Sequence, residues 1–199
     1  MGSVAELAVD GEQSLELCRR AGALLTGHFR LTSGLHSDQY FQCATLMEDP
    51  KVGEQIAAAV AGVCRGWNVD VVVAPALGAI LFGYELARQL GVRNIFVERP
   101  EGKFEFRRGF GLRSGERVLI AENVITTGGS AIETAELVRS VGGVVAGYAL
   151  IVDRSGGRFA PPEPVAAYAG FQAKVFQPEE CPLCQVNIPI TKPGSRAIG

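Results

Sequence analysis

A chain of 199 residues with 47% apolar residues is long enough to bury one substantial core, so we expect a single domain over residues 1–199. Its 19 Lys and Arg nearly balance its 21 Asp and Glu, which excludes a global field for nucleic acid or an anionic membrane. Five scattered cysteines, no secretory signal and no apolar run near roughly 20 residues predict a cytoplasmic protein without membrane spans.

Helical and strand patterns alternate along the chain. Apolar residues recur at mostly helical spacing over residues 13–25, which predicts an N-terminal amphipathic helix. Residues 29–42 predict two strands joined by a turn at Ser33-Gly34. Further helices are predicted near 51–65, 78–90 and 130–141, and strands at 69–74, 94–98, 117–122 and 144–152. The proline-rich tail from Pro161 predicts short strands and loops.

Two of the predicted strands, VDVVVA and RVLIA, are continuously apolar, which is typical of a parallel sheet covered by helices on both faces. We therefore expect an α/β fold with an open, mostly parallel central sheet flanked by helices. In such folds ligands bind outside the carboxyl ends of the strands. A site is therefore expected in the loops that follow Ala74, Glu98, Glu122 and Val152.

The segment RVLIAENVITTGGSAIE, residues 117–133, runs from a buried strand into a turn rich in glycine and hydroxyl groups before a helix. Gly128 and Gly129 permit close backbone approach, and the helix N-terminus offers unpaired N–H groups, which together suit a phosphate. The spacing matches neither a P-loop nor the dinucleotide fingerprint. An ordinary turn with Ser130 as the helix N-cap is the alternative.

The sequence ENVITTGGS resembles the motif that binds phosphoribosyl pyrophosphate (PRPP) in type I phosphoribosyltransferases, in which two acids precede a TTGGS-like loop. The resemblance implies that the acid positions hold the ribose hydroxyls and that the loop binds the 5′-phosphate. The second acid position is an amide here, which keeps hydrogen bonding but lacks a negative charge. The implied PRPP-binding residues are Glu122, Asn123, Val124, Ile125, Thr126, Thr127, Gly128, Gly129 and Ser130.

Residues 27–42, GHFRLTSGLHSDQYFQ, are similar to the N-terminal hood of orotate phosphoribosyltransferases. The resemblance implies a small hood, formed by about residues 1–45 and the C-terminal tail, in which Tyr40 and Phe41 pack beside orotate. Thr32 stands where relatives often carry a basic residue. The alternative is a plain hairpin whose aromatic side chains fill the core, with His36 on its surface.

Arg154 follows a long apolar strand and offers a fixed fork of donors for a carboxylate, the group that distinguishes orotate from uracil. The resemblance implies that Arg154 and Thr126 hold orotate. A solvated ion pair of Arg154 with Asp153 or Glu163 is the alternative.

Two more loops resemble parts of this family. The turn after the strand VDVVVA is similar to its pyrophosphate loop, with contacts expected from backbone N–H groups at Ala76, Leu77 and Gly78. The basic segment 98–113 predicts a mobile hairpin and resembles a lid that reaches the pyrophosphate, usually in the neighbouring subunit. Lys103 and Arg99 are its implied catalytic contacts, and a solvated basic face is the alternative.

Cys181 and Cys184 form a C-x-x-C pair near the end of the chain. Zinc normally needs four ligands, and the remaining cysteines and both histidines are distant in sequence, so we do not expect a metal. A redox role needs a following helix, which Pro189 and Pro193 oppose. The pair and the Lys-Pro-Gly-Ser-Arg run after it also resemble the tail of bacterial members of the family.

The resemblance covers nearly the whole chain and implies an orotate phosphoribosyltransferase activity, which converts orotate and PRPP to orotidine 5′-monophosphate and pyrophosphate. Magnesium is the implied cofactor, held mainly through PRPP without direct protein ligands, and a homodimer sharing the basic loop is implied. The alternatives are transfer to another nucleobase or a PRPP-binding regulator, which Asn123 favours. No DNA-binding module precedes Phe29, so we expect no nucleic-acid or membrane partner.

Overall fold

Two β-sheets organise this computed structural model, which describes residues 5–31 and 33–192. Thr32 and most of the terminal Lys-Pro-Gly-Ser-Arg run lie outside the described residues. The central sheet has seven strands, parallel except for the last pair. Their order is β1 (Glu6–Leu7), β9 (Val165–Gly170), β8 (Val144–Asp153), β7 (Arg117–Ile125), β4 (Val71–Pro75), β5 (Arg93–Glu98) and β6 (Glu105–Phe106).

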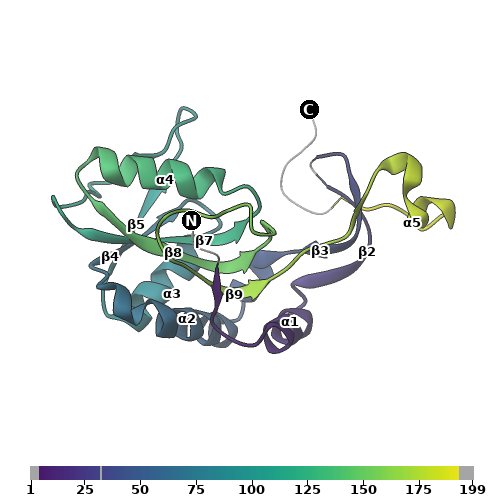
Figure 1. Cartoon of the computed structure of the whole chain (residues 1–199), viewed down its shortest axis with the longest axis horizontal. Coiled ribbons are helices and arrows are strands. Elements are labelled where there is room, and N and C mark those ends of the chain that lie inside the picture. The colour runs from purple at the N-terminus through teal and green to yellow at the C-terminus, as the bar shows by residue number, and fades with distance from the viewer. Residues whose placement is uncertain (1–4, 32, 193–199) are drawn as a thin grey trace.

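Helices cover both faces of this sheet (Figure 1). One face carries α4 (Gly129–Ser140), and the opposite face carries α2 (Pro50–Cys64) and α3 (Ile80–Leu90). Two further helices, α1 (Gly11–Arg20) and α5 (Pro182–Gln185), lie at the side of the hood, and short 3₁₀ helices span Cys43–Met47, Arg65–Trp67 and Pro178–Glu180. No helix within the described ranges is long and apolar enough to cross a bilayer.

Strand β4 shows how one strand supplies two cores. Val72 and Ala74 belong to the core beneath α2 and α3, whereas Val71 and Val73 belong to the core beneath α4. All four side chains are fully buried, because successive residues of a strand point to opposite faces of the sheet. The α/β fold with a mostly parallel sheet, expected from these apolar runs, is thereby confirmed.

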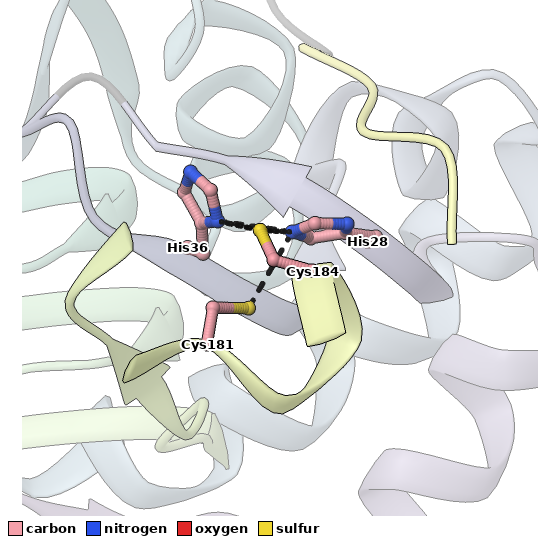
Figure 2. A group of neighbouring side chains, drawn as sticks. All are labelled: His28, His36, Cys181 and Cys184. Carbon is pink, nitrogen blue, oxygen red and sulfur yellow. Dashed lines mark hydrogen bonds between the residues drawn. The ribbon is translucent and has the colours of Figure 1, made fainter. Parts of the chain in front are cut away.

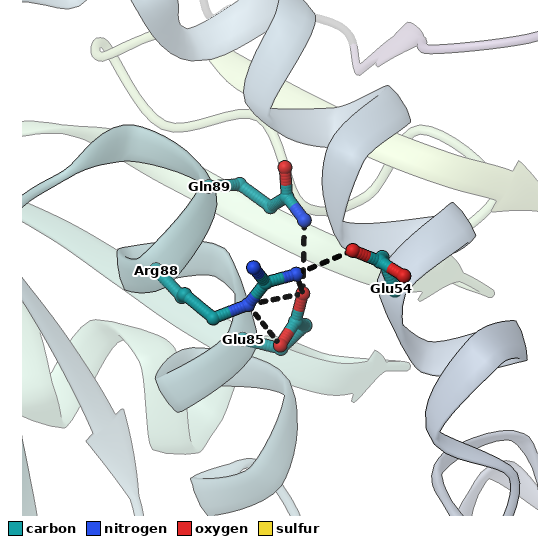
Figure 3. Close-up of polar contacts among 4 residues, drawn as sticks. All are labelled: Glu54, Glu85, Arg88 and Gln89. Atoms are coloured by element: carbon teal, nitrogen blue, oxygen red, sulfur yellow. Dashed lines mark hydrogen bonds and ion pairs between the residues drawn. The ribbon is translucent and has the colours of Figure 1, made fainter.

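Helices α2 and α3 pack side by side and are linked at the surface by Arg88 (Figure 3). Its guanidinium contacts Glu85 on its own helix at 2.7 Å and Glu54 on α2 at 2.6 Å. The hydrogen bonds from Arg88 lower the pKa of Glu85. Because Arg88 and Glu54 are half exposed, water screens the pair, and the buried apolar faces of the two helices supply most of the attraction.

The hood is a separate three-stranded antiparallel sheet of β2 (Leu24–Arg30), β3 (His36–Phe41) and β10 (Val175–Phe176). The turn at Ser33-Gly34 joins β2 and β3, as the sequence predicted. The tail follows the hairpin further, because Thr191 accepts a hydrogen bond from Arg30 and donates one to His28. In Figure 1 this sheet stands beside the central sheet, with α5 at its outer edge. Strand β1 pairs with β9 of the central sheet and not with the hood strands. The predicted extent of the hood, about residues 1–45 and the C-terminal tail, otherwise stays a prediction.

Two predicted boundaries were wrong, and one strand has a position that the sequence did not indicate. The first helix ends at Arg20 rather than near residue 25, because the chain turns at Gly22, where φ is +68°, and Leu24 begins β2. Strand β7 continues to Ile125, because residues 122–125 remain paired with β8. The tail contains short strands as predicted, yet β9 joins the central sheet parallel to β8, which its composition did not indicate.

Candidate active site

The site lies where two neighbouring strands send the chain to opposite faces of the sheet. After β4 the chain enters α3 on one face, and after β7 it enters α4 on the other. Pairing between β4 and β7 ends at Val73 and Ile120, whereas β7 stays paired with β8 up to Ile125. The last residues of β7 therefore border an opening at a topological switch point, the usual ligand position in such sheets.

The turn after β7 presents free backbone donors. No acceptor is found among the described residues for the N–H groups of residues 127–131. Gly128 adopts φ +82° as the N-cap of α4, and a Cβ there would lie 2.3 Å from Cδ2 of Phe159, so only glycine fits. Ser130 lies inside the helix, so its predicted alternative role as the N-cap was wrong. The turn suits a phosphate.

Glu122 is a buried acid beside this turn, with 8% of its surface exposed. Its Oε1 accepts a hydrogen bond from the backbone N–H of Asn123 at 3.0 Å, and it has no ion pair within the described part of the chain. Burial raises the pKa of Glu122 to about 7, and that hydrogen bond only partly opposes the change. A ligand that donates hydroxyl groups would satisfy this carboxylate.

Asn123 joins the two loops of the site. Its Oδ1 accepts the N–H of Val124 at 2.8 Å, and its Nδ2 lies so close to Gly78 that a Cβ there would approach it to 2.6 Å. The loop after β4 is fixed by a hydrogen bond from Ala76 N–H to the carbonyl of Val97 at 2.8 Å. The predicted pyrophosphate loop and the PRPP motif are therefore in contact. Leu77, in the same loop, is 84% exposed.

Two residues of the predicted PRPP set contribute no side chain to the opening. Ile125 is buried in the core beneath α4, and Val124 packs against the opposite core. The carbonyl of Ile125 accepts the N–H of Arg154 at 2.8 Å. Thr126 and Thr127, in contrast, are exposed. Any role of Val124 and Ile125 in ligand binding is therefore restricted to their backbone.

Arg154 is a half-buried cation beside the turn. Its guanidinium lies 5.7 Å from the centre of the Phe171 ring, and it makes no ion pair with any described residue. The expected alternative partners are engaged elsewhere, because Asp153 accepts the N–H of Ser155 and Glu163 pairs with Arg139. The ion-pair alternative was therefore wrong.

The surroundings of Arg154 favour an anionic ligand. Burial lowers the pKa of Arg154, while Tyr40 and Cys43 act in the opposite direction. A cation that is desolvated without an acidic partner gains from an anion that enters its pocket. Orotate carries such a group, and uracil does not.

Tyr40 and Phe41 lie on opposite faces of β3, as adjacent strand residues must. Phe41 is buried and packs against Phe171, with ring centres 5.5 Å apart. Tyr40 is half-buried and contacts the ring of Phe29 at 5.8 Å. The core-filling alternative therefore describes Phe41, whereas Tyr40 keeps an accessible side chain near Arg154.

The basic segment forms a hairpin, as predicted, because Glu98 of β5 pairs with Glu105 of β6. Glu133 of α4 fixes its base by pairing with Arg99 and accepting the N–H of Phe104 at 2.7 Å. The guanidinium of Arg99 also lies 4.2 Å from the centre of the Phe104 ring. Lys103 at the tip is exposed and has no partner among the described residues, so it remains available for an anion.

Sequence reasoning missed three residues of this region. Glu133 fixes the hairpin, Cys43 donates a hydrogen bond to the carbonyl of Asn123 at 3.3 Å, and Phe171 packs between Phe41 and Arg154. Burial raises the pKa of the Cys43 thiol. No local pattern marks these residues, because each acts through a contact with a distant segment.

The predicted isolation of the C-x-x-C pair was also wrong. His28 of β2 and His36 of β3 meet Cys181 and Cys184, and the ligand atoms of all four lie within 4.8 Å of one another (Figure 2). His36 is buried rather than on the hairpin surface. Residues that are distant along the chain are close in space here, because the tail returns to the hairpin of β2 and β3.

A turn with free N–H donors, a buried acid and a glycine loop meet at one switch point, an arrangement that suits a phosphorylated ligand. The phosphoribosyl transferase domain matches residues 44–179. Orotate phosphoribosyltransferase of Caldanaerobacter subterraneus subsp. tengcongensis is 45% identical over 190 residues, 96% of this chain and 100% of that protein. The enzyme of the same name from Caldicellulosiruptor bescii is 47% identical over 92% of this chain and 96% of its own length.

A solved structure supports the same assignment. Orotate phosphoribosyltransferase of Mycobacterium tuberculosis H37Rv in complex with inorganic phosphate is 26% identical, with a TM-score of 0.66, over 79% of this chain and 94% of that chain. This chain therefore belongs to the phosphoribosyltransferase family and, within it, to the orotate phosphoribosyltransferases.

Proposed function

We propose that this chain transfers the ribose 5-phosphate group of PRPP to orotate, giving orotidine 5′-monophosphate and pyrophosphate in de novo UMP biosynthesis. The observation that carries this proposal is Arg154, a half-buried cation without an acidic partner among the described residues, hydrogen-bonded through its backbone to the strand that leads into the phosphate turn. A carboxylate held there lies beside the ribose site. The names of the relatives agree with this substrate.

The PRPP roles follow from the same geometry. The free N–H groups of residues 127–131 and the hydroxyls of Thr126, Thr127 and Ser130 would hold the 5′-phosphate. The Glu122 carboxylate and the Asn123 amide would hold the ribose hydroxyls. Backbone groups of Ala76, Leu77 and Gly78 would face the pyrophosphate.

The reaction needs positioning and charge compensation rather than a covalent nucleophile. Orotate N1 forms a bond to C1 of the ribose as the bond to pyrophosphate breaks, and the leaving group takes that electron pair. Arg154, with Thr126, would orient the base, and Tyr40 would cover its ring, while Phe41 supports Phe171 beneath Arg154. Lys103 would neutralise charge on the departing pyrophosphate, and Arg99 would hold the hairpin that carries Lys103.

Magnesium fits this site as a cation held mainly through PRPP. Glu122 offers an oxygen donor next to the ribose position, and the described residues place no cluster of three carboxylates there. Bound Mg²⁺ would offset charge on the pyrophosphate oxygens. Glu122 itself would orient the hydroxyls that share the ion.

The proposal is tested with Arg154→Gln, which removes the charge and keeps most of the side-chain volume. We expect kcat/KM for orotate to fall at least roughly 100-fold, because a desolvated ion pair is lost, while PRPP binding persists. Arg65→Gln, at an exposed position of a 3₁₀ helix, is the matched control. Equal kcat/KM of wild type and Arg154→Gln for orotate would show that Arg154 does not hold the carboxylate, and a preference of wild type for uracil would show that another base is the substrate.

We further propose a homodimer that shares the basic hairpin. Leu77, Leu81 and Tyr84 lie at helical spacing on and before α3, with 84%, 60% and 63% of their surfaces exposed. Such an apolar surface beside the pyrophosphate loop suits a second copy of the chain. The exposed Lys103 would then reach the partner's site.

The shared hairpin is tested by complementation between two inactive variants. Lys103→Ala and Glu122→Gln chains are co-expressed, so that mixed dimers contain one site with both residues intact. We expect activity to recover to roughly a quarter of wild type, because half of randomly formed dimers are mixed and each has one good site. No recovery in verified mixed dimers would place Lys103 in its own subunit's site.

A cytoplasmic location is proposed because all five cysteines are free thiols in the structure. Mass measurement of the protein taken from cells after rapid thiol alkylation should find every thiol alkylated or protected by a metal. A disulfide in that sample would contradict a reducing location.

A further inference from the structure

Four side chains of metal-binding residue types, from distant parts of the chain, meet at the hood strands β2 and β3 (Figure 2). His28 and His36 come from adjacent strands of the β2–β3 hairpin, Cys181 is the N-cap residue of α5, and Cys184 lies within that helix. Three of the four are buried, with Cys184 exposed. Neither the proposed reaction nor the packing of the sheets requires these four residue types together.

Four of the six separations between the ligand atoms are close to those around a tetrahedral ion, and all six are within 4.8 Å. A zinc ion bound by two nitrogens and two sulfurs separates its ligand atoms by about 3.3 to 3.8 Å. Here Nε2 of His28 lies 3.0 Å from Nδ1 of His36, and Sγ of Cys184 lies 3.7 and 3.4 Å from these two nitrogens. Sγ of Cys181 lies 3.5 Å from Nε2 of His28. Small shifts of side chains would centre an ion among them.

The orientation of His28 also favours metal binding. Its Nδ1 lies 2.8 Å from the carbonyl oxygen of Ile188. A carbonyl oxygen can only accept a hydrogen bond, so Nδ1 must be the donor. The proton is therefore on Nδ1, and Nε2 points into the cluster as a lone pair. A backbone carbonyl that fixes the tautomer in this way is a frequent second partner of metal-bound histidine.

We propose that His28, His36, Cys181 and Cys184 bind one structural zinc ion. Binding displaces one proton from each thiol, so that two thiolates balance the charge of the ion and two neutral imidazoles complete the tetrahedron. All four positions are filled by protein, which is the pattern of a structural rather than a catalytic site. The exposed Cys184 gives the ion a route into the cluster.

The ion would join the tail to the hairpin that bears Tyr40. Besides this cluster, the two segments are joined by the two-residue strand β10, by the hydrogen bonds of Thr191, and by those of Ser37 and His28 to tail carbonyls. The ligands lie up to 156 residues apart, so a bond between them constrains a long stretch of the unfolded chain. Zinc would therefore stabilise the hood over the base site.

The first test is the metal content of the full chain, purified without chelator and with any affinity tag removed. Elemental analysis should find about one zinc per chain. Cys184→Ala and His36→Ala should each reduce this to below about a tenth of an equivalent, because three ligands rarely retain a structural ion. Cys64→Ala, which removes a buried thiol of α2 outside the cluster, should retain the zinc.

A second measurement keeps the proposal testable if a variant fails to fold. Wild-type protein stripped of metal and supplied with Co²⁺ should show the visible absorption bands of a tetrahedral cobalt site and a thiolate charge-transfer band. Stripping should also lower Tm by several degrees, and added Zn²⁺ should restore it.

Three results would overturn the proposal. They are folded wild-type protein without zinc and without cobalt bands, iron in place of zinc, and a disulfide between Cys181 and Cys184 in protein alkylated directly on lysis. These outcomes are independent of the transferase activity, because none of them is read from turnover.

Discussion

Glu122→Gln tests the electrostatics of the ribose site through protein stability. Glu122 has a pKa of about 7 in the folded chain, against an ordinary value of 4.5. The folded state thus keeps a proton that the unfolded state loses between these two pH values, so stability falls as pH rises through that window. At about 1.4 kcal/mol per pKa unit, the ionised carboxylate lowers the free energy of unfolding by roughly 3 kcal/mol above pH 7.

Urea unfolding of wild type and Glu122→Gln, without ligand, measures this effect. The variant should be more stable by roughly 3 kcal/mol at pH 8 and by under about 1 kcal/mol at pH 5, because Gln stays neutral at both. Glu179→Gln, at an exposed position, should change stability little at either pH. The same Glu122 variant should bind PRPP at least roughly tenfold more weakly at pH 8. A variant that is no more stable than wild type at pH 8 would contradict the raised pKa of Glu122 in the folded chain.

Three further substitutions probe the loops. Gly78→Ala places a Cβ 2.6 Å from Nδ2 of Asn123 and should raise KM for PRPP at least roughly tenfold. The control is Gly62→Ala in α2, where an added Cβ would meet nothing within 4 Å and should stabilise the chain by about 0.5–1 kcal/mol. Equal KM values for wild type and Gly78→Ala would contradict the contact between Gly78 and Asn123. Asn123→Asp adds a negative charge beside Glu122, which should raise the pKa of Glu122 and shift the rise in PRPP affinity to higher pH. An unchanged midpoint of that pH profile would exclude repulsion between the two carboxylates. Lys103→Ala should lower kcat without changing Tm, and a lower Tm would indicate a structural role.

The parts of the site that are contiguous in sequence could be predicted. The segment from Thr126 to Ser130 follows a buried strand and contains the N-terminus of a helix, so its free N–H groups follow from local structure alone. Arg154 was predicted because the carboxyl ends of parallel strands share one edge of the sheet. The alternation of strand side chains would also have separated Tyr40 from Phe41, because neighbours on a strand cannot share a face.

Contacts between distant segments could not be predicted. Gly128 must be glycine because Phe159 packs against it, and no pattern near either residue indicates that approach. The end of α1 was misplaced because Leu24 and Leu25 fit helical spacing as well as they fit a strand, and the turn at Gly22 decided between them.

The histidine and cysteine cluster shows the same limit more strongly. Cys181 lies 153 residues from His28, and only the return of the tail along the hairpin brings them together. A C-x-x-C without a nearby second pair is weak in sequence, because the other ligands here come one from each strand of a hairpin.

The most direct test of the proposed transferase activity is the loss of orotate absorbance when wild-type protein is mixed with PRPP and Mg²⁺. We expect that orotate is consumed, with one orotidine 5′-monophosphate and one pyrophosphate formed for each PRPP used, and that omission of PRPP stops the reaction. If PRPP binds but orotate is not consumed by wild type or by Asn123→Asp, the chain does not act as an orotate phosphoribosyltransferase.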